Sequence, residues 1–211
     1  MSSPLASTLT PELCLAPDVV TDPLHVALVV SEVLERCGLR YLVGGSLASS
    51  VSGEPRSTLD VDLVVEMTED DVGPLVAALG DAFYVDEHAV RRAVRARASV
   101  NLIHHGTSTK VDIFILGGTP LDEEQMARRV AITVATAPDR LLYVYTPEDI
   151  VLQKLRWFRR GNEVSDRQWR DVLGIVAVQR DRLDLDYLRR GADVLGVSDL
   201  LERAIEEAPQ A

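Results

Sequence analysis

The pattern of apolar and polar positions predicts a mixture of strands and helices up to about residue 146. Short apolar runs that end at turn residues predict strands, and apolar residues repeating every three or four positions predict helices. The expected strands are residues 41–43, 59–66, 83–85, 99–104, 110–116, 131–136 and 141–145, and the expected helices are 23–37, 46–52, 68–80, 86–97 and 122–129. This mixture indicates an α/β or α+β domain over residues 23–146.

The pattern changes at Pro147, after which only helices are expected. Their ranges are 147–160, 165–179, 184–195 and 198–207, which predicts a small all-α C-terminal region over residues 147–211. Residues 1–22 are rich in Ser, Thr and Pro and show no clear period, so we expect a loose N-terminal arm. At the second of the four helices, Ser165 and Gln168 have the spacing of a capping box.

The composition is that of a soluble globular protein, since 46% of the 211 residues are hydrophobic and 26% are charged. No apolar run reaches the roughly 18 residues that span a bilayer. The N-terminus lacks the pattern of a signal peptide, and Cys14 and Cys37 are too few for a disulfide framework. We therefore expect a cytoplasmic protein without a membrane partner.

The formal net charge of −11 argues against broad, sequence-independent binding of nucleic acid, which relies on a positive surface. Basic residues are nevertheless clustered in two segments, Arg91–Arg97 and Lys154–Arg160. Local docking of RNA therefore stays open. The segment Arg91–Arg97 is interpreted either as a solvated helix face or as a phosphate-binding patch.

The most informative stretch joins a glycine-rich turn to two carboxylates. The turn Gly44-Gly45-Ser46 is followed by thirteen residues and then by Asp60 and Asp62 on an apolar strand. Alternate residues of a strand point to the same face, so both carboxylates would meet at one point. A divalent cation would compensate their repulsion, and the backbone N–H groups of the turn suit phosphate. Together these features predict a site for a metal-bound nucleoside triphosphate.

Asp112 is the third acidic candidate, because it interrupts an otherwise apolar strand at residues 110–115. A buried strand rarely carries an aspartate without a partner. If this strand pairs beside residues 59–66, three carboxylates converge. They would then suit two magnesium ions about 3.5–4 Å apart, or one ion and a general base. The alternative is an edge strand on which Asp112 faces water.

Lys154 lies within the apolar stripe of the helix expected at residues 147–160, whereas Gln153, Arg156 and Arg160 fall on the other side. A lysine in this position needs a polar destination. A phosphate in the cleft between the two halves of the chain would serve, and a side chain that reaches solvent is the alternative.

These motifs resemble the nucleotidyltransferase superfamily that includes DNA polymerase beta. The likeness rests on Gly-Gly-Ser, on Asp-x-Asp thirteen residues later, and on an aspartate in a later strand. Three further segments, residues 53–60, 147–154 and 165–171, resemble the bacterial AbiEii/AbiGii-type branch, which includes toxins of toxin–antitoxin pairs. The resemblance covers about residues 40–175. It implies a nucleotidyltransferase-like mixed sheet flanked by helices, followed by the small all-α C-terminal region.

The resemblance also implies a role for each matching residue. Asp60, Asp62 and Asp112 would bind the metal ions, and Asp112 would help to deprotonate the attacking hydroxyl. The nucleotide and its phosphates would be bound by Gly44, Gly45, Ser46, Arg56, Lys154, Arg170 and Asp171. For Arg56 a plain loop cation is the alternative. For Asp171 a solvated or ion-paired role is the alternative, since it points away from the apolar stripe of its helix.

The predicted activity is metal-dependent transfer of a nucleoside monophosphate from an NTP such as ATP to a hydroxyl, with release of pyrophosphate. The metal is Mg²⁺, with two ions expected and Mn²⁺ as a substitute. The acceptor is left open among RNA such as tRNA, a protein side chain and a small molecule such as an aminoglycoside. A toxin with a cognate antitoxin is one version of this enzyme, and an antibiotic-modifying enzyme is another. The rival from a different class is a non-catalytic, nucleotidyltransferase-like protein that binds a nucleotide or a partner.

Overall fold

The computed structural model describes residues 12–13, 22–53, 59–134 and 138–209, and within them the chain forms one mixed sheet. The strands are β1 (Glu12–Leu13), β2 (Arg40–Val43), β3 (Asp60–Glu66), β4 (Phe83–Tyr84), β5 (Ser99–His104), β6 (Lys110–Ile115), β7 (Val130–Val134) and β8 (Arg140–Val144). Their order is β1-β7-β8-β2-β3-β6-β5-β4. The pairs β3–β6, β2–β8 and β1–β7 are parallel and the others antiparallel. The predicted mixed sheet is confirmed.

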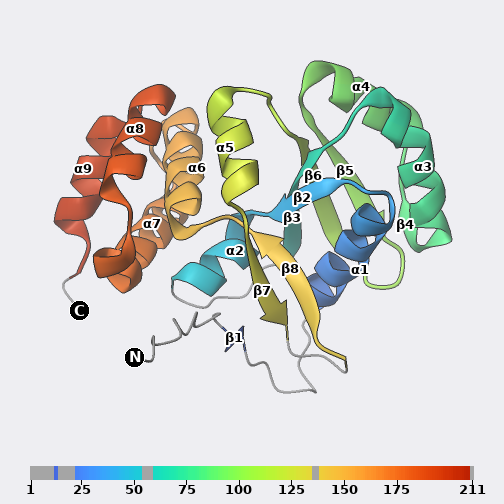
Figure 1. The fold of residues 1–211 in the computed structure, drawn as a ribbon, viewed down its shortest axis with the longest axis horizontal. Coiled ribbons are helices and arrows are strands. Elements are labelled where there is room, and N and C mark those ends of the chain that lie inside the picture. Colours follow the sequence, from blue (N-terminus) through green and yellow to red (C-terminus); the bar gives the residue numbers. More distant parts are fainter. Residues whose placement is uncertain (1–11, 14–21, 54–58, 135–137, 210–211) are drawn as a thin grey trace, which may run out of the picture.

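Helices α1 (Asp22–Arg36), α3 (Glu69–Leu79) and α4 (Glu87–Ala96) lie together on one side of the sheet (Figure 1). The apolar positions of β3 explain this arrangement, because Val61, Leu63 and Val65 are fully buried while the residues between them are not. The strand therefore buries one face and keeps the other, which carries Asp60 and Asp62, partly open. Helix α3 begins with the expected cap, in which the Thr68 hydroxyl donates to Asp71 Oδ2 at 2.7 Å.

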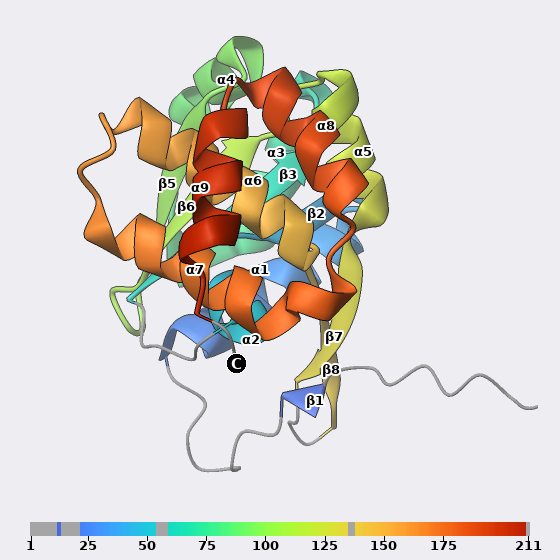
Figure 2. The ribbon, with the colours of Figure 1, turned by 90° about the vertical axis from the view of Figure 1, so that its left-hand side faces the viewer.

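Helices α6 (Pro147–Arg160), α7 (Asp166–Gln179), α8 (Leu185–Leu195) and α9 (Ser198–Glu207) gather at the other end of the molecule (Figures 1 and 2). All four were predicted to within about one residue. Helices α6 and α8 approach closely at Gly191, where an added Cβ would lie 2.4 Å from Leu152 Cδ1. The hydrophobic core runs without a break from the sheet into α6. The division into an arm, a mixed domain and a helical region stays a prediction.

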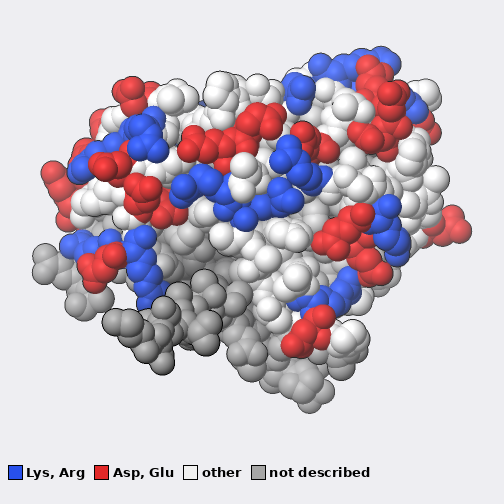
Figure 3. All heavy atoms as spheres, viewed as in Figure 1, with Lys and Arg blue, Asp and Glu red and all other residues white. Residues whose placement is uncertain are grey.

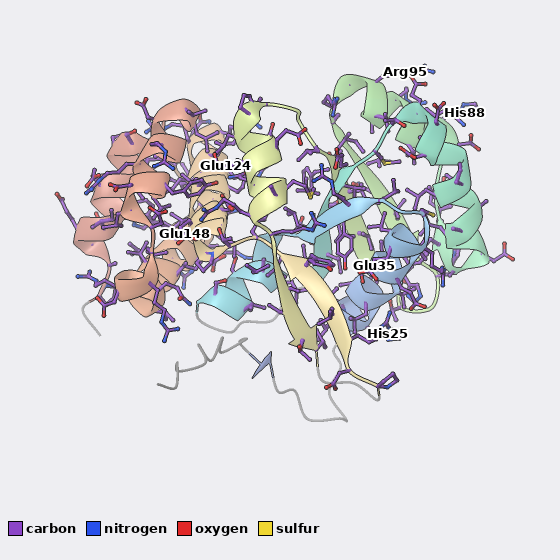
Figure 4. The ribbon with its side chains drawn as sticks, in the orientation of Figure 1. His25, Glu35, His88, Arg95, Glu124 and Glu148 are labelled. Atoms are coloured by element: carbon purple, nitrogen blue, oxygen red, sulfur yellow. The ribbon has the colours of Figure 1, made fainter. Side chains whose placement is uncertain are left out.

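A buried polar cluster joins α5 (Pro120–Arg128), α6 and α8. The carboxylate of Asp149, which is fully buried, accepts hydrogen bonds from Tyr187 Oη at 2.5 Å and from Thr146 Oγ1 at 2.9 Å. The Arg128 guanidinium lies 3.8 Å from the centre of the Tyr187 ring and 3.6 Å from a carboxylate oxygen of Glu148, which is labelled in Figure 4. These contacts fix the helical region against α5.

On the face of the molecule drawn in Figure 3, basic and acidic side chains are both common and lie near one another. On α4, the basic cluster predicted from the sequence is largely paired: Arg91 binds Glu87 at 2.7 Å and Arg95 binds Glu69 at 2.6 Å. Arg95 lies at the outer edge of the molecule, away from the helical region (Figure 4). This part of the cluster is a solvated, ion-paired face.

No helix in the described ranges is long and apolar enough to cross a membrane.

Candidate active site

The two strands that carry the candidate carboxylates lie side by side. Strand β3 pairs in parallel with β6, and the register places Asp62 directly beside Asp112 and Asp60 beside Lys110. Because side chains at alternate positions share a face, Asp60, Asp62 and Asp112 all point away from the buried face of the sheet. The condition for the three carboxylates to converge, that the two strands pair, is therefore met, and Asp112 lies on an interior strand and not at an edge.

The carboxylates act on one another. Burial raises the pKa of Asp62 above its ordinary value, and the charges of Asp112 and Asp60 raise it further, whereas Lys110 and Lys154 lower it. Lys110 Nζ lies 2.8 Å from Asp112 Oδ2, and this hydrogen bond raises the pKa of Lys110. The site thus concentrates negative charge at Asp62, with two lysines as partial compensation.

The glycine turn packs directly against Asp62. The Gly44 N–H donates to the Asp62 backbone carbonyl at 2.9 Å, and Gly45 follows with a φ of +56°. A Cβ at Gly45 would lie 1.8 Å from Asp62 Oδ2, so no side chain fits there without moving the carboxylate. Gly45 opens helix α2 (Gly45–Ser52), whose first turn has no side-chain cap. The first residue of α2 therefore packs directly against the Asp62 carboxylate.

Lys154 is 5% exposed and its polar destination is helix α7. Its Nζ lies 2.7 Å from Asp171 Oδ2 and 3.2 Å from Gln168 Oε1. Ser165 accepts the Gln168 N–H at 3.3 Å as predicted, but the Gln168 side chain binds Lys154 instead of reaching back to complete a capping box. Asp171 is therefore ion-paired with Lys154, and its role in nucleotide binding stays a prediction.

A cleft of about 580 Å³ runs between the sheet and α6. Gly45, Asp62 and Lys154 line it together with the aromatic side chains Phe114 and Trp157. Three arginines, Arg97, Arg156 and Arg160, also line the cleft, and so does Gln153. The sequence pattern set Gln153, Arg156 and Arg160 on the side of α6 opposite to Lys154. All three are less buried than Lys154, as this pattern predicts, and they line the cleft together with it.

The remaining candidates are less closely gathered. Arg56 lies outside the described residues. Arg170 is exposed and its Nε donates to the Asp166 carbonyl at 3.4 Å, within its own helix. Two residues of the site were not predicted from the sequence, Lys110 and Arg167. Lys110 pairs with Asp112, and Arg167 Nη2 donates to Ser46 Oγ at 2.9 Å. A signal existed for Arg167, because it lies four residues before Asp171 and so on the same face of α7.

The chemistry of the donor set fits a hydrated divalent cation. The described part of the chain contains no group of three His, Cys, Asp or Glu side chains set close enough to hold a metal ion by themselves. Mg²⁺ does not need such a group, because it is bound by one or two carboxylates together with water and substrate phosphates. Asp62 and Asp112 are adjacent in register and Asp62 contacts the glycine turn, so two carboxylates are available to such a cation.

A scan against protein-family models and a search of curated proteins both give no match. Solved structures do match. An antigenic nucleotidyltransferase-like protein from Paracoccidioides brasiliensis superposes with a TM-score of 0.53 at 17% identity, covering 90% of this chain and 95% of that chain. ANT(2")-Ia in complex with adenylyl-2"-tobramycin superposes with a TM-score of 0.51 at 10% identity, covering 83% and 98%. The chain therefore has a nucleotidyltransferase-like fold.

Proposed function

We propose that the chain is a metal-dependent nucleotidyltransferase that moves a nucleoside monophosphate from an NTP to a hydroxyl acceptor. The observation that carries this proposal is the contact of Gly45 with Asp62, which stands beside Asp112 on the neighbouring strand. A turn suited to phosphate thus lies against Asp62 at the wall of the cleft, and Asp112 stands beside Asp62 on the next strand. The nucleotidyltransferase-like fold supports the same activity.

The triphosphate end of the substrate would lie at the glycine turn. Backbone N–H groups at Gly45 and Ser46 would donate to phosphate oxygens, and the positive end of the α2 dipole would favour their negative charge. Lys154 lines the same cleft, and its ammonium is held in place by Asp171 and Gln168. A lysine fixed in this way contributes a point charge for the phosphates without the entropy cost of ordering a free side chain.

Asp62 and Asp112 would hold Mg²⁺ together with water and phosphate oxygens, and Asp60, two residues before Asp62 on the same face of β3, would add a third carboxylate nearby. When bound, the cation would neutralise negative charge on the phosphate oxygens and on these carboxylates. The raised pKa of Asp62 reflects burial and the charges of Asp112 and Asp60. A site in which carboxylates repel one another in this way is one that favours a cation.

In the transfer step, the acceptor hydroxyl oxygen attacks the α-phosphorus and forms a new P–O bond. The bond between the α-phosphorus and the oxygen that bridges it to the β-phosphorus breaks, and pyrophosphate leaves with the electron pair. Asp112 accepts the proton of the hydroxyl. The groups at Gly45, Ser46 and Lys154 orient the phosphates so that attack and departure are in line.

A finer proposal follows from the motif resemblance, namely that the enzyme is the toxin of a toxin–antitoxin pair. This version predicts that expression arrests growth and that Asp62→Ala relieves the arrest at equal protein level. Antibiotic modification predicts resistance instead of arrest. If the protein only binds nucleotide, neither growth arrest nor resistance is expected. Its Tm should then still rise when NTP and Mg²⁺ are added.

The direct test is transfer of label from each α-labelled NTP, with Mg²⁺, to separate pools of RNA, protein and aminoglycosides. Asp62→Ala is the test variant. The matched control is Asp193→Ala, which removes an exposed carboxylate from α8, away from the cleft. Label that enters one pool with the wild type and the control, but not with Asp62→Ala, would support the proposal and name the acceptor class. Transfer that survives Asp62→Ala undiminished would contradict it.

A further inference from the structure

Arg167 joins the C-terminal helices to the glycine turn. It lies in the first turn of α7, 121 residues along the chain from Ser46, and its Nη2 donates to Ser46 Oγ at 2.9 Å. Ser46 is the second residue of α2 and so belongs to the turn to which the proposed function assigns the phosphates. A guanidinium is therefore already present beside the proposed phosphate position.

Two neighbours of Arg167 on α7 bind the lysine that lines the cleft. Gln168 and Asp171, one and four residues further along, both hold Lys154 Nζ, at 3.2 and 2.7 Å. Residues four apart on a helix are neighbours, so Arg167 and Asp171 point the same way. Residues 167–171 thus contribute the guanidinium of Arg167 and hold the ammonium of Lys154 in position.

The contact with Ser46 leaves most of the hydrogen-bonding capacity of Arg167 available. Arg167 is exposed, and its guanidinium donates to the neutral hydroxyl of Ser46. A neutral hydroxyl uses one of the five N–H donors of a guanidinium, whereas a phosphate can accept two in parallel and is charged. A triphosphate bound at the turn would therefore compete well for this side chain.

A purely structural role for Arg167 is the alternative, and other contacts already provide it. The far end of α7 is tied to α2 by Gln179 Nε2, which donates to the Ser52 carbonyl at 2.9 Å. At Gly53 an added Cβ would lie 3.0 Å from Ile175 Cγ1, so the two segments are in close contact there as well. These contacts hold α7 on α2 in addition to the one that Arg167 makes.

We propose that Arg167 binds the phosphates of the NTP and moves from Ser46 to the substrate when the nucleotide enters. This inference rests on the proposed function. It adds a binding residue that comes from the helical region and not from the sheet. It also explains why the helical region lies against α2: the phosphate site is complete only when α7 is in place.

The test compares Arg167→Ala and Arg167→Lys with the wild type in the NTP transfer assay. The matched control is Arg189→Ala, which removes an exposed arginine of α8 that pairs with Glu202 and does not line the cleft. Arg167→Ala should raise KM for NTP about tenfold, the usual effect of losing a hydrogen bond to a charged group. Arg167→Lys should restore part of the loss, because the charge remains and the bidentate geometry does not.

Tripolyphosphate separates a phosphate contact from a structural effect. Tripolyphosphate, used as a competitive inhibitor, should bind Arg167→Ala more weakly than the wild type by the same factor as NTP. Adenosine, which has no phosphate, should inhibit both proteins equally. The Tm without nucleotide should stay close to that of Arg189→Ala. If Arg167→Ala matched Arg189→Ala in both KM and tripolyphosphate inhibition, this inference would fail while the proposed function stood. If the wild type neither bound nor used NTP, both would fail.

Discussion

Gly45→Ala perturbs the contact on which the proposed site depends. The new Cβ would lie 1.8 Å from Asp62 Oδ2, 2.6 Å from its Cγ and 2.9 Å from its Cβ. Real Cβ atoms do not approach this closely, so the carboxylate or the turn must move. Forcing atoms into a packed site costs about 1–3 kcal/mol. The backbone also has a φ of +56°, which costs a non-glycine residue about 1–2 kcal/mol.

Gly38→Ala separates these two costs. Gly38 has a φ of +71° and nothing lies within 4 Å of its added Cβ, so this substitution brings the backbone cost alone. We expect Gly45→Ala to lose about 1–3 kcal/mol more free energy of unfolding than Gly38→Ala. In thermal unfolding this is roughly 2–12 °C of additional loss in Tm, at about 2–4 °C per kcal/mol for a chain of this size.

The assays are thermal unfolding without nucleotide and NTP transfer with Mg²⁺. Gly45→Ala should lose transfer by about a hundredfold, because small displacements of reacting groups carry penalties of that order. Gly38→Ala should retain wild-type transfer. Equal stability and equal activity of the two variants would refute the reasoning, since the close approach of the turn to Asp62 would then have no consequence.

Three further predictions concern charged and buried groups. Since burial and neighbouring carboxylates raise the pKa of Asp62, the folded state holds its proton more tightly than the unfolded state, and stability falls as pH rises through the raised pKa. Asp62→Asn should therefore raise the Tm of the metal-free protein near neutral pH. This gain in Tm should vanish as the pH falls toward the ordinary Asp pKa of about 3.9. A gain in Tm that grew on acidification would contradict the assignment. Asp171→Asn removes the carboxylate that pairs with the buried Lys154 ammonium and should lower the free energy of unfolding in urea by about 3 kcal/mol. Adding Lys154→Met should restore most of this loss. An unchanged urea midpoint in Asp171→Asn would show that the ion pair does not contribute to stability. Tyr187→Phe removes a donor to buried Asp149 and should cost about 1–3 kcal/mol in urea unfolding without changing NTP affinity, whereas a change in affinity would link this cluster to the cleft.

Most of the fold could be predicted because its signals are local. Pro147 at the first turn of α6, and Thr68 as the cap of α3, mark helix starts that the structure confirms. Helix α5 was predicted to begin at residue 122 but begins at Pro120, after the cap Thr119. The prediction relied on the apolar period and passed over a Thr-Pro start, which is itself a local signal.

The arrangement of the site depends on contacts between distant segments, which a single sequence does not specify. The alternation in β3 placed Asp60 and Asp62 on one face, but only the register of β3 with β6 sets Asp62 beside Asp112. Lys154 was recognised as a lysine in need of a polar partner, and its partner Asp171 lies 17 residues along the chain on another helix. Such pairings follow from the tertiary packing of α6 against α7 and not from local propensity.

The measurement that tests the central claim most directly is the fate of the two ends of the triphosphate. The wild-type protein is incubated with Mg²⁺, acceptor and either α-labelled or γ-labelled NTP, and the labelled products are separated. Nucleoside monophosphate transfer predicts α-label in the acceptor and γ-label in pyrophosphate, with both products lost in Asp62→Ala and kept in Asp193→Ala. If γ-label appeared in the acceptor, or if both products persisted in Asp62→Ala, transfer centred on the carboxylates beside Gly45 would be contradicted.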